Sequence, residues 1–293
     1  MTPVEIFVFS YNRGEWLRTL LESIQAQFSP DLAARLHIFD DQSTDRTTLD
    51  VLEAAKQAGA EVLNARDYTL QQNGSRGGLH AGIEAALLHV ARPGSVAFLL
   101  QDDMQIVRPV GEKDVQSFAA LARSSGNPFV YVNFWTGGEA YRRADMKWRE
   151  GYHVKFSRRE GRYRGYTDVC FVDIDLLRAS GFRFHNSEKA LDHEAAALFP
   201  PMAWSPFPVS AMLPDPTIYR NGQATGGRHY RFSPWDAQTC AAFLARDPQD
   251  SLPIAENFLA IEGEHVPAPW KYGPEPTKAQ RIARAIKRLL RGR

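Results

Sequence analysis

Short apolar runs alternate along the first hundred residues with longer segments whose apolar residues recur every three or four positions. The runs predict strands, and they cover residues 4–9, 36–39, 60–63 and 96–100. The helical spacing predicts amphipathic helices between them, marked by Trp16, Leu17, Leu20, Leu21 and Ile24, by Leu49, Leu52 and Ala55, and by Leu79, Ile83, Leu87 and Val90. Strands and helices that alternate at this length imply right-handed crossovers and a parallel sheet. We therefore expect an α/β fold.

The fourth strand ends in the most informative polar group. The unbroken apolar run from Val96 to Leu100 is typical of a strand covered on both faces, and Asp102 and Asp103 follow it. Ligands of open α/β sheets bind at the carboxyl ends of the strands. Adjacent carboxylates repel each other unless a cation or a donor compensates them, and they suit Mg²⁺ or Mn²⁺. We expect a ligand site here; two solvated aspartates in a surface turn are the alternative.

The pattern becomes mixed after Val107. We expect a helix over residues 115–122, a strand over 129–132, a strand over 167–172, a helical turn over 174–179 closed by Gly181, and a helix over 195–199 opened by Asp192, His193 and Glu194. Aromatic and basic residues gather in 134–166, where Trp135 and its neighbours could stack on a sugar ring and the bases could hold an anionic acceptor. An edge hairpin with a solvated face is equally compatible with this segment.

Composition narrows the class of protein. The 293 residues are 44% hydrophobic and 24% charged, as in a soluble globular protein. Cys170 and Cys240 show no metal-binding spacing and favour a reducing compartment, where both pack as thiols. Neither a signal peptide nor a membrane-spanning run is expected, so we predict a cytoplasmic protein.

Charge is distributed unevenly along the chain. The net charge is +1, yet residues 278–293 contain seven bases and no acid, so the body is mildly acidic. This balance argues against a nucleic-acid partner for the main domain.

In the tail 277–293, Ile282, Ile286 and the pair Leu289 and Leu290 share one helical face. Such a helix could lie on an anionic membrane; a docked helix or a disordered end are the alternatives.

A glycine-rich loop, residues 73–78, precedes the third helix. Its glycines and Arg76 suit a phosphate at a helix start. The sequence has neither GxxxxGK[ST] nor GxGxxG, which disfavours a P-loop NTPase and an ordinary dinucleotide-binding domain.

Five short motifs occur in one order along the chain. They are Phe9-Ser10-Tyr11-Asn12-Arg13, Asp40-Asp41-Gln42-Ser43-Thr44-Asp45, Gln101-Asp102-Asp103, Val172-Asp173-Ile174-Asp175-Leu176-Leu177 with Ser180-Gly181-Phe182, and Leu213-Pro214-Asp215-Pro216-Thr217-Ile218-Tyr219-Arg220. In this order they resemble the GT-A glycosyltransferases, especially the inverting enzymes of glycosyltransferase family 2, over residues 4–225. The resemblance implies a GT-A-like, Rossmann-like, mostly parallel sheet flanked by helices.

The resemblance also implies a domain organisation. A catalytic domain, residues 1–225, would divide into a nucleotide-sugar-binding half, 1–106, and a mixed α/β acceptor-side half, 107–225. A C-terminal extension, 226–276, and the basic helical tail, 277–293, would follow.

Roles for individual residues come from the same resemblance. Asp40 or Asp41 would recognise the nucleobase, Asp102 the ribose, and Asp103 would ligate the Mn²⁺ or Mg²⁺ that bridges the diphosphate. Asp192 would be the catalytic base. The nucleotide-sugar contacts would be Ser10, Tyr11, Asn12, Arg13, Asp40, Asp41, Arg76, Asp102 and Arg220; the metal contacts Asp103 and His229; and Trp135 would contact the acceptor.

Three departures from the family pattern affect these roles. Gln101 replaces the commoner acid of the DXD-type triplet, and Leu191 stands where an acid usually precedes the base. Arg220 replaces the usual late histidine. Either His229 substitutes for that histidine as a metal ligand, or Arg220 holds the diphosphate itself.

The function that the resemblance implies is glycosyl transfer. The sugar of a UDP-sugar would pass, with inversion and with a metal ion's help, to a glycan or lipid-linked acceptor in polysaccharide biosynthesis. A non-catalytic carbohydrate-binding or assembly protein is the alternative, since the three departures weaken the pattern. A sugar nucleotidyltransferase is disfavoured because its GxGxR loop is missing.

Overall fold

The structure is a computed structural model. It describes residues 2–64, 67, 78–135, 146–155, 169–185, 187–214, 216–220, 223–225, 227–249 and 252–262. The tail 277–293 lies outside the described residues.

Helices and strands alternate through the first hundred residues and become mixed afterwards. The helices are α1 (Gly14–Gln27), α2 (Arg46–Gln57), α3 (Gly78–Ala85) with a π-helical turn (Ala86–Val90), α4 (Glu112–Ser125), α5 (Ile174–Ala179), α6 (Glu188–Leu198), α7 (Ala237–Ala245) and α8 (Ala255–Phe258). The strands are β1 (Val4–Ser10), β2 (Ala34–Asp40), β3 (Glu61–Leu63), β4 (Val96–Gln101), β5 (Met104–Ile106), β6 (Phe129–Tyr131), β7 (Met146–Arg149), β8 (Tyr152–Lys155), β9 (Phe171–Asp173), β10 (Ala203–Trp204), β11 (Ser210–Met212), β12 (Ile218–Arg220) and β13 (Gln223–Thr225).

One nine-stranded sheet organises the molecule, in the order β3-β2-β1-β4-β9-β6-β10-β8-β7. The first four strands are parallel, whereas β9 is antiparallel to both β4 and β6. Beyond β6, strand β10 runs parallel to it, and β8 and β7 complete an antiparallel edge. The register pairs Ser10 with Asp40 and Phe9 with Gln101, so the polar ends of β1, β2 and β4 meet at one edge of the sheet.

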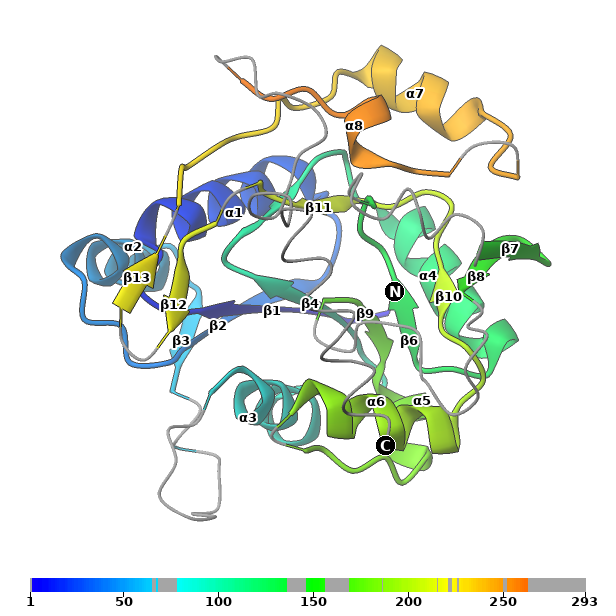
Figure 1. The fold of residues 1–293 in the computed structure, drawn as a ribbon, viewed down its shortest axis with the longest axis horizontal. Coiled ribbons are helices and arrows are strands. Elements are labelled where there is room, and N and C mark those ends of the chain that lie inside the picture. Colours follow the sequence, from blue (N-terminus) through cyan, green and yellow to red (C-terminus); the bar gives the residue numbers. More distant parts are fainter. Residues whose placement is uncertain are drawn as a thin grey trace, which may run out of the picture.

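Helices cover both faces of this sheet (Figure 1). Helices α1 and α2 lie on one face, and α3, α5 and α6 lie on the other. The strands between them are apolar on both sides: every residue of β1 from Val4 to Phe9 is buried, as are Val96 to Leu100 of β4. The α/β fold and its mostly parallel sheet are therefore confirmed, because the unbroken apolar runs do form the doubly covered strands.

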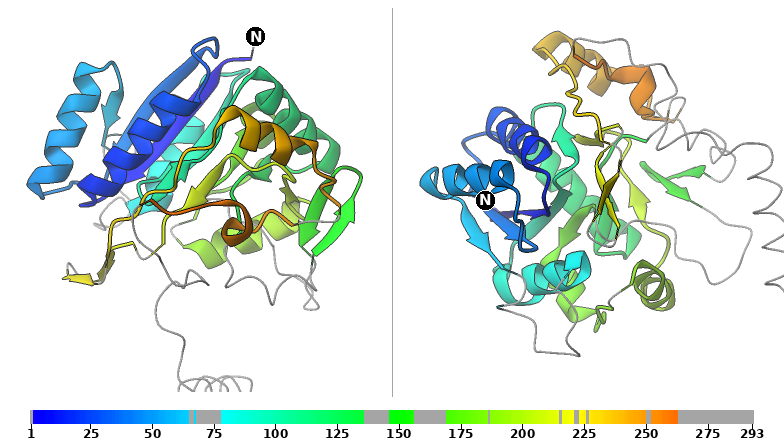
Figure 2. Two further views of the ribbon diagram at one scale, coloured as in Figure 1. Left: turned by 90° about the horizontal axis from the view of Figure 1, so that it is seen from above. Right: turned by 60° about the vertical axis from the view of Figure 1, so that its left-hand side comes forward.

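The described part of the C-terminal extension packs on the body through a second apolar cluster. Its buried residues are Val107, Phe134, Ala211, Leu213, Phe232, Phe243, Ala255 and Leu259. Figure 2 shows α7 and α8 on the outside of the sheet-and-helix layers. The side chain of Gln105 on β5 exchanges two hydrogen bonds with the backbone of Phe232, at 2.9 and 2.8 Å. The extension is therefore anchored to the strand that directly follows Asp103.

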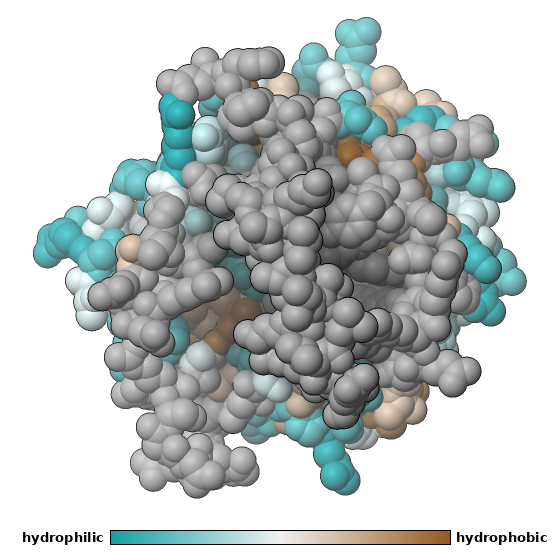
Figure 3. Space-filling view, in the orientation of Figure 1, coloured by the Kyte–Doolittle hydropathy of each residue, from teal (hydrophilic) through white to brown (hydrophobic). Residues whose placement is uncertain are grey.

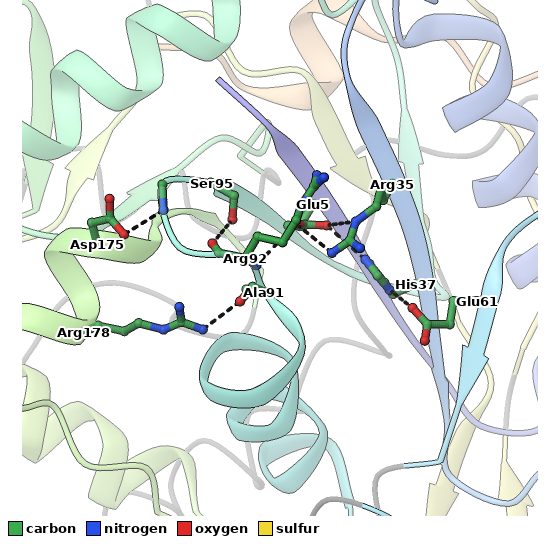
Figure 4. A network of polar contacts seen from close by, with 10 residues as sticks. Glu5, Arg35, His37, Glu61, Ala91, Arg92, Ser95, Asp175 and Arg178 are labelled. Atoms are coloured by element: carbon green, nitrogen blue, oxygen red, sulfur yellow. Dashed lines mark hydrogen bonds and ion pairs between the residues drawn. The ribbon is translucent and has the colours of Figure 1, made fainter. Parts of the chain in front are cut away.

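A buried charge network lies toward the other end of β1 from Ser10 (Figure 4). The Glu5 carboxylate is fully buried and accepts hydrogen bonds from Arg35 of β2, from His37 Nε2 and from Arg92, which precedes β4. His37 Nδ1 also contacts Glu61 of β3 at 2.8 Å. The Glu5 carboxylate on β1 thus bonds two side chains of β2 and one from the segment before β4, and His37 extends the network to Glu61 on β3.

Several predicted details were wrong. Helix α6 begins at Glu188, with the Ser187 hydroxyl accepting from the backbone N–H of Ala190. Asp192 therefore lies within the helix and does not open it. Leu49 of α2 is 43% exposed, because Thr48 takes the buried position beside it. The sequence pattern also missed the short strands β5, β10, β11, β12 and β13.

Two further expectations concern the cysteines and the membrane. Cys170 and Cys240 are both buried thiols that are not joined in a disulfide, as predicted for packing thiols. Within the described ranges, every helix is too short or too polar to cross a lipid bilayer.

Candidate functional site

A cavity of about 270 Å³ opens at the polar edge of the sheet. The ends of β1, β2 and β4 and the start of α3 line it, with Phe9, Ser10, Tyr11, Arg13, Phe39, Asp40, Asp41, Gly78, Leu79, Gly82, Gln101 and Asp102. Figure 3 shows apolar surface recessed in the face of the molecule where these elements meet in Figure 1. Phe9 and Phe39 stack with ring centroids 5.7 Å apart. The cavity thus combines an aromatic wall with carboxylates at its sides, as ligand pockets commonly do.

Asn12 organises the loop after β2. Its backbone is left-handed, with φ at 50°, which Asn tolerates better than most residues. Its Oδ1 accepts from the backbone N–H groups of Thr44 and Asp45, at 2.7 and 3.2 Å. Asn12 is absent from the cavity lining, so the structure gives this predicted nucleotide contact a supporting position.

Gly14 lets the two loops approach each other. A Cβ at this position would lie 2.5 Å from the backbone nitrogen of Thr48. The first turns of α1 and α2 therefore meet with only a glycine between them, and the loops that precede both helices are brought to one side of the cavity.

Asp40 and Asp41 are held in different ways. Asp40 accepts from the backbone N–H of Ser43 at 2.8 Å and from its hydroxyl at 2.5 Å. Burial raises the pKa of the Asp40 carboxyl above its usual value, although these bonds oppose the rise. Asp41 Oδ1 accepts from the backbone N–H of Gly78 at 3.4 Å, at the start of α3. Both predicted base-recognising acids line the cavity.

Arg13 joins the two acids at the end of β4. Its Nη1 lies 2.8 Å from Asp102 Oδ1 and 3.1 Å from Asp103 Oδ2. Asp102 Oδ2 also accepts from the backbone N–H of Tyr11 at 3.0 Å. Burial raises the pKa of Asp102 to about 6, even though the charge of Arg13 favours the ionised form. One guanidinium is therefore shared between two buried carboxylates.

The donor set fits a divalent cation that substrate oxygens complete. Asp102 and Asp103 are only 3% and 4% exposed and offer hard carboxylate oxygens. Mg²⁺ and its analogues are commonly held by one or two carboxylates together with substrate phosphates. In the described part of the chain no cluster of three or more His, Cys, Asp or Glu side chains is arranged to hold a metal ion.

His229 is placed against α1. Its Nε2 lies 2.8 Å from the Thr19 hydroxyl, and its ring meets Trp16 edge to face at 5.4 Å. Burial lowers the pKa of His229. Both contacts hold the imidazole ring against α1. Among the described residues, His229 does not form a group of three metal ligands with Asp102 and Asp103. Its metal role stays a prediction, without support from this geometry.

Asp192 and Trp135 lie in the mixed part of the fold that follows β5. Asp192 is half-buried on α6, whereas its neighbour His193 is exposed. Trp135 is only 3% exposed and packs edge to face on Trp204, with centroids 5.0 Å apart. Trp135 is therefore a core residue in this arrangement, and its indole ring has no exposed face on which an acceptor could stack.

The alternative of an edge hairpin is confirmed for part of the aromatic segment, because β7 and β8 pair antiparallel at the end of the sheet. Arg76 lies outside the described residues, and so does the side chain of Arg220, although the backbone of Arg220 belongs to β12.

Sequence reasoning missed the aromatic wall and one backbone contact. Phe9 and Phe39 are the last apolar residues of β1 and β2, a position that could have placed them beside the ligand edge. Gly82 gives the wall its close packing, since a Cβ there would lie 3.2 Å from the Phe9 ring. The carbonyl of Thr217 accepts from Arg13 Nε at 2.7 Å. Nothing in the sequence pairs two residues so far apart.

Comparison with known families agrees with this geometry. Residues 5–104 match the family model described as "Glycosyl transferase family 2". The chain resembles glycosyltransferase family 2. The match ends just after Asp102 and Asp103, spans 100 of the 293 residues and includes every residue that lines the cavity. No curated protein sequence matches the chain.

The chain is also similar to several solved structures. Residues 1–349 of TarS from S. aureus are 16% identical, with a TM-score of 0.47, over 72% of this chain and 60% of that one. Mannosyltransferase PcManGT from Pyrobaculum calidifontis, in complex with GDP-Man and Mn²⁺, is 16% identical, with a TM-score of 0.46, over 72% and 56%. An active-site mutant of LgtC is 11% identical, with a TM-score of 0.44, over 84% and 98%. The chain thus spans little more than half of the first two proteins, and their ligands cannot be carried over to it.

Proposed function

We propose that the protein transfers a sugar from a nucleotide-diphosphate sugar to an acceptor hydroxyl. The observation that carries this proposal is the cavity at the strand ends, which places an aromatic wall between Asp40 and Asp41 on one side and Asp102 on the other. It lies within the range that resembles glycosyltransferase family 2. A nucleobase would stack on the aromatic wall, with its N–H groups toward Asp40 and Asp41. The ribose and the diphosphate would then extend toward Asp102 and Arg13.

The proposed donor is a UDP-sugar. Asp40 or Asp41 would accept a hydrogen bond from the base, with Ser10 and Tyr11 beside it, and Asp102 would accept from the ribose hydroxyls. Asp103, with Asp102, would hold Mn²⁺ or Mg²⁺. The bound cation would supply Lewis-acid neutralisation of the diphosphate leaving group. Arg76 and Arg220 are proposed to add positive charge near the phosphates.

Asp192 is the proposed catalytic base. Its carboxylate would take the proton of the acceptor hydroxyl as that oxygen attacks the anomeric carbon from the face opposite the diphosphate, which inverts the configuration. The acceptor would be a glycan or a lipid-linked sugar bound on the side of α6. Residues 1–225 would form the catalytic domain and 226–276 an extension of it. The tail 277–293 would bring a cytoplasmic enzyme to an anionic membrane surface.

A non-catalytic carbohydrate-binding or assembly role is the second candidate. Arg13 bonds both acids of the DXD-type motif, and Leu191, which stands where family members carry an acid, is 2% exposed. Both features would be tolerated in a protein that binds sugars without turning them over.

A panel of nucleotide-sugars tests the first candidate. We expect one donor to raise the melting temperature, with a larger rise when Mn²⁺ is present, since a ligand that binds only the folded state stabilises it. The same donor should then be hydrolysed or transferred. Asp41→Asn should abolish the shift, whereas Asp50→Asn, on the exposed side of α2, should retain it. A shift without any turnover would favour the non-catalytic role, and the lack of any shift would contradict the proposed transfer from a nucleotide-sugar.

A further inference from the structure

The guanidinium of Arg13 holds three acceptors at once. Its Nη1 bonds Asp102 Oδ1 at 2.8 Å and Asp103 Oδ2 at 3.1 Å, and its Nε bonds the carbonyl oxygen of Thr217 at 2.7 Å. The Arg13 side chain is 18% exposed and the two carboxylates 4% and 6%. Such charge-assisted bonds between partly buried groups are stronger than surface ion pairs.

We propose that Arg13 is a resident counter-cation that a divalent metal ion must displace from the two carboxylates, and that this displacement loosens the segment ending at Thr217. Arg13 would thus be a positioning residue that opposes metal binding in the donor-free protein. The inference shares with the proposed function only the placement of a cation at Asp102 and Asp103.

Competition follows from the position of Nη1. It contacts one oxygen of each carboxylate, so a cation that used the same two oxygens would need the place that this nitrogen occupies. The guanidinium carries one positive charge and the metal two, and like charges repel strongly where water is scarce. Metal binding through both oxygens and the present Arg13 contacts therefore exclude each other.

Because Arg13 also bonds Thr217, loss of its contacts with the two carboxylates would affect the segment that contains Thr217. Thr217 is 9% exposed and precedes β12 directly. Gly227, which follows β13, lies so close that a Cβ on it would be 1.9 Å from the Thr217 hydroxyl oxygen. The base of the β12–β13 hairpin is thus fixed around Thr217, and Arg13 is the side chain that bonds its carbonyl.

The other end of the same segment is attached to Asp103 by its backbone. The N–H of Leu213 donates to the Asp103 carbonyl at 2.7 Å, and this bond does not involve the carboxylate. Displacement of Arg13 would release the segment at Thr217 while it stays fixed at Leu213. The hairpin would then be able to pivot about that point, and its position would depend on whether metal or arginine neutralises the acids.

Calorimetric titration of Mn²⁺ alone into nucleotide-free protein tests the competition. Arg13→Gln should bind Mn²⁺ about tenfold more tightly than wild type, a size usual for coupled sites. Arg18→Gln is the matched control, because Arg18 lies on α1, which Arg13 directly precedes, and pairs with exposed Glu15; its affinity should be that of wild type. Thermal melting of each variant establishes that it is folded.

Arg13→Lys separates the two parts of the proposal. The ammonium restores the opposing charge, so Mn²⁺ affinity should return toward wild type, but it lacks the second N–H group that holds Thr217. Hydrogen exchange in peptides covering residues 213–220 should rise with Mn²⁺ in wild type and be high without Mn²⁺ in Arg13→Lys. Mn²⁺ binding by Arg13→Gln that is equal to wild type, weaker or absent would overturn the proposal. Hydrogen exchange of residues 213–220 in wild type that does not change with Mn²⁺ would also overturn it. Failure of nucleotide-sugar turnover would instead count against the proposed function alone.

Discussion

The backbone N–H of Asn12 donates to the Ser43 hydroxyl at 2.8 Å, and this bond joins the loop after β1 to the loop after β2. The same hydroxyl donates to Asp40 Oδ1. A buried serine thus orients a cavity carboxylate and satisfies a backbone donor of the neighbouring loop.

Replacement of Ser43 by alanine should disturb both loops. It leaves the Asn12 N–H without this acceptor, which costs about 1–3 kcal/mol for a buried donor, and it frees the Asp40 carboxylate to rotate. We expect lower stability in urea unfolding and weaker nucleotide-sugar binding. Thr44→Ala, at an exposed position of the same loop, is the control. Unchanged binding by Ser43→Ala would remove Asp40 from base recognition.

Gln42 has a backbone conformation that favours glycine, with φ at 63°. A left-handed non-glycine residue costs roughly 1–2 kcal/mol, whereas glycine adds about 0.5–1 kcal/mol of unfolded-state entropy. Gln42→Gly should therefore raise the free energy of unfolding slightly, by up to about 1 kcal/mol. Asn12→Gly provides the contrast: its φ is also positive, but the change removes the bonds to Thr44 and Asp45 and should destabilise. A destabilised Gln42→Gly would show that the Gln42 side chain contributes more than its backbone strain costs.

The parts of the fold that could be predicted were those with strong local patterns. The uninterrupted run Val96–Leu100 can be buried on both sides only in a covered central strand, and its register beside β1 brings Asp102 to the end of the neighbouring strand. The acids after β2 reach the same edge for the same reason. The sequence therefore places the carboxylates of the cavity correctly with no knowledge of distant contacts.

The parts that could not be predicted depend on long-range packing or on very short elements. The bond from Arg13 to Thr217 joins residues 204 positions apart. Strand β10 has only two residues, too few for any period to be recognised. The start of α6 depends on the Ser187 cap, and the first turn after it contains Glu188 and Lys189, so the apolar pattern does not mark the first residue of the helix. The burial of Trp135 depends on its packing against Trp204, from a strand that the pattern did not reveal.

Asp192 should be essential for transfer and unimportant for donor binding. Asp192→Asn keeps the shape of the side chain but removes the proton acceptor, and general-base groups contribute about 10²–10⁴-fold to rate. We expect transfer to fall by that factor while the dissociation constant of the donor stays near wild type. His193→Ala, on the exposed face of α6, should retain transfer. If Asp192→Asn transfers at the wild-type rate, another group is the base.

The basic tail should direct the protein to anionic membranes. Each basic group near such a surface contributes on the order of 1 kcal/mol, and salt screens the attraction. Full-length protein should float with anionic vesicles and be released by salt, whereas protein ending at Pro276 should not float, and neutral vesicles should bind neither. Equal flotation of both proteins would contradict a membrane role for 277–293.

Glu5 should make folding stability depend on acid pH. Burial by itself raises the pKa of Glu5, but hydrogen bonds from His37, Arg35 and Arg92 outweigh it and hold the pKa at about 2 instead of the ordinary 4.5. The folded state therefore favours the ionised form. The stabilisation is complete above pH 4.5 and is lost as the pH falls toward 2; the full difference amounts to about 3 kcal/mol.

Urea unfolding of wild type and Glu5→Gln at pH 6 and pH 3 measures this contribution. Between these values wild type should lose about 2 kcal/mol more than the variant, since part of the linked protonation is complete by pH 3. Glu5→Gln should also be less stable at pH 6, because it leaves buried His37 and the partly exposed guanidinium groups of Arg35 and Arg92 facing an uncharged amide. Glu61→Gln is the matched control: it contacts the same His37, but its side chain is 54% exposed, so it should unfold nearly as wild type does at both values. Parallel losses for wild type and Glu5→Gln would mean that acid destabilises the protein through other carboxylates.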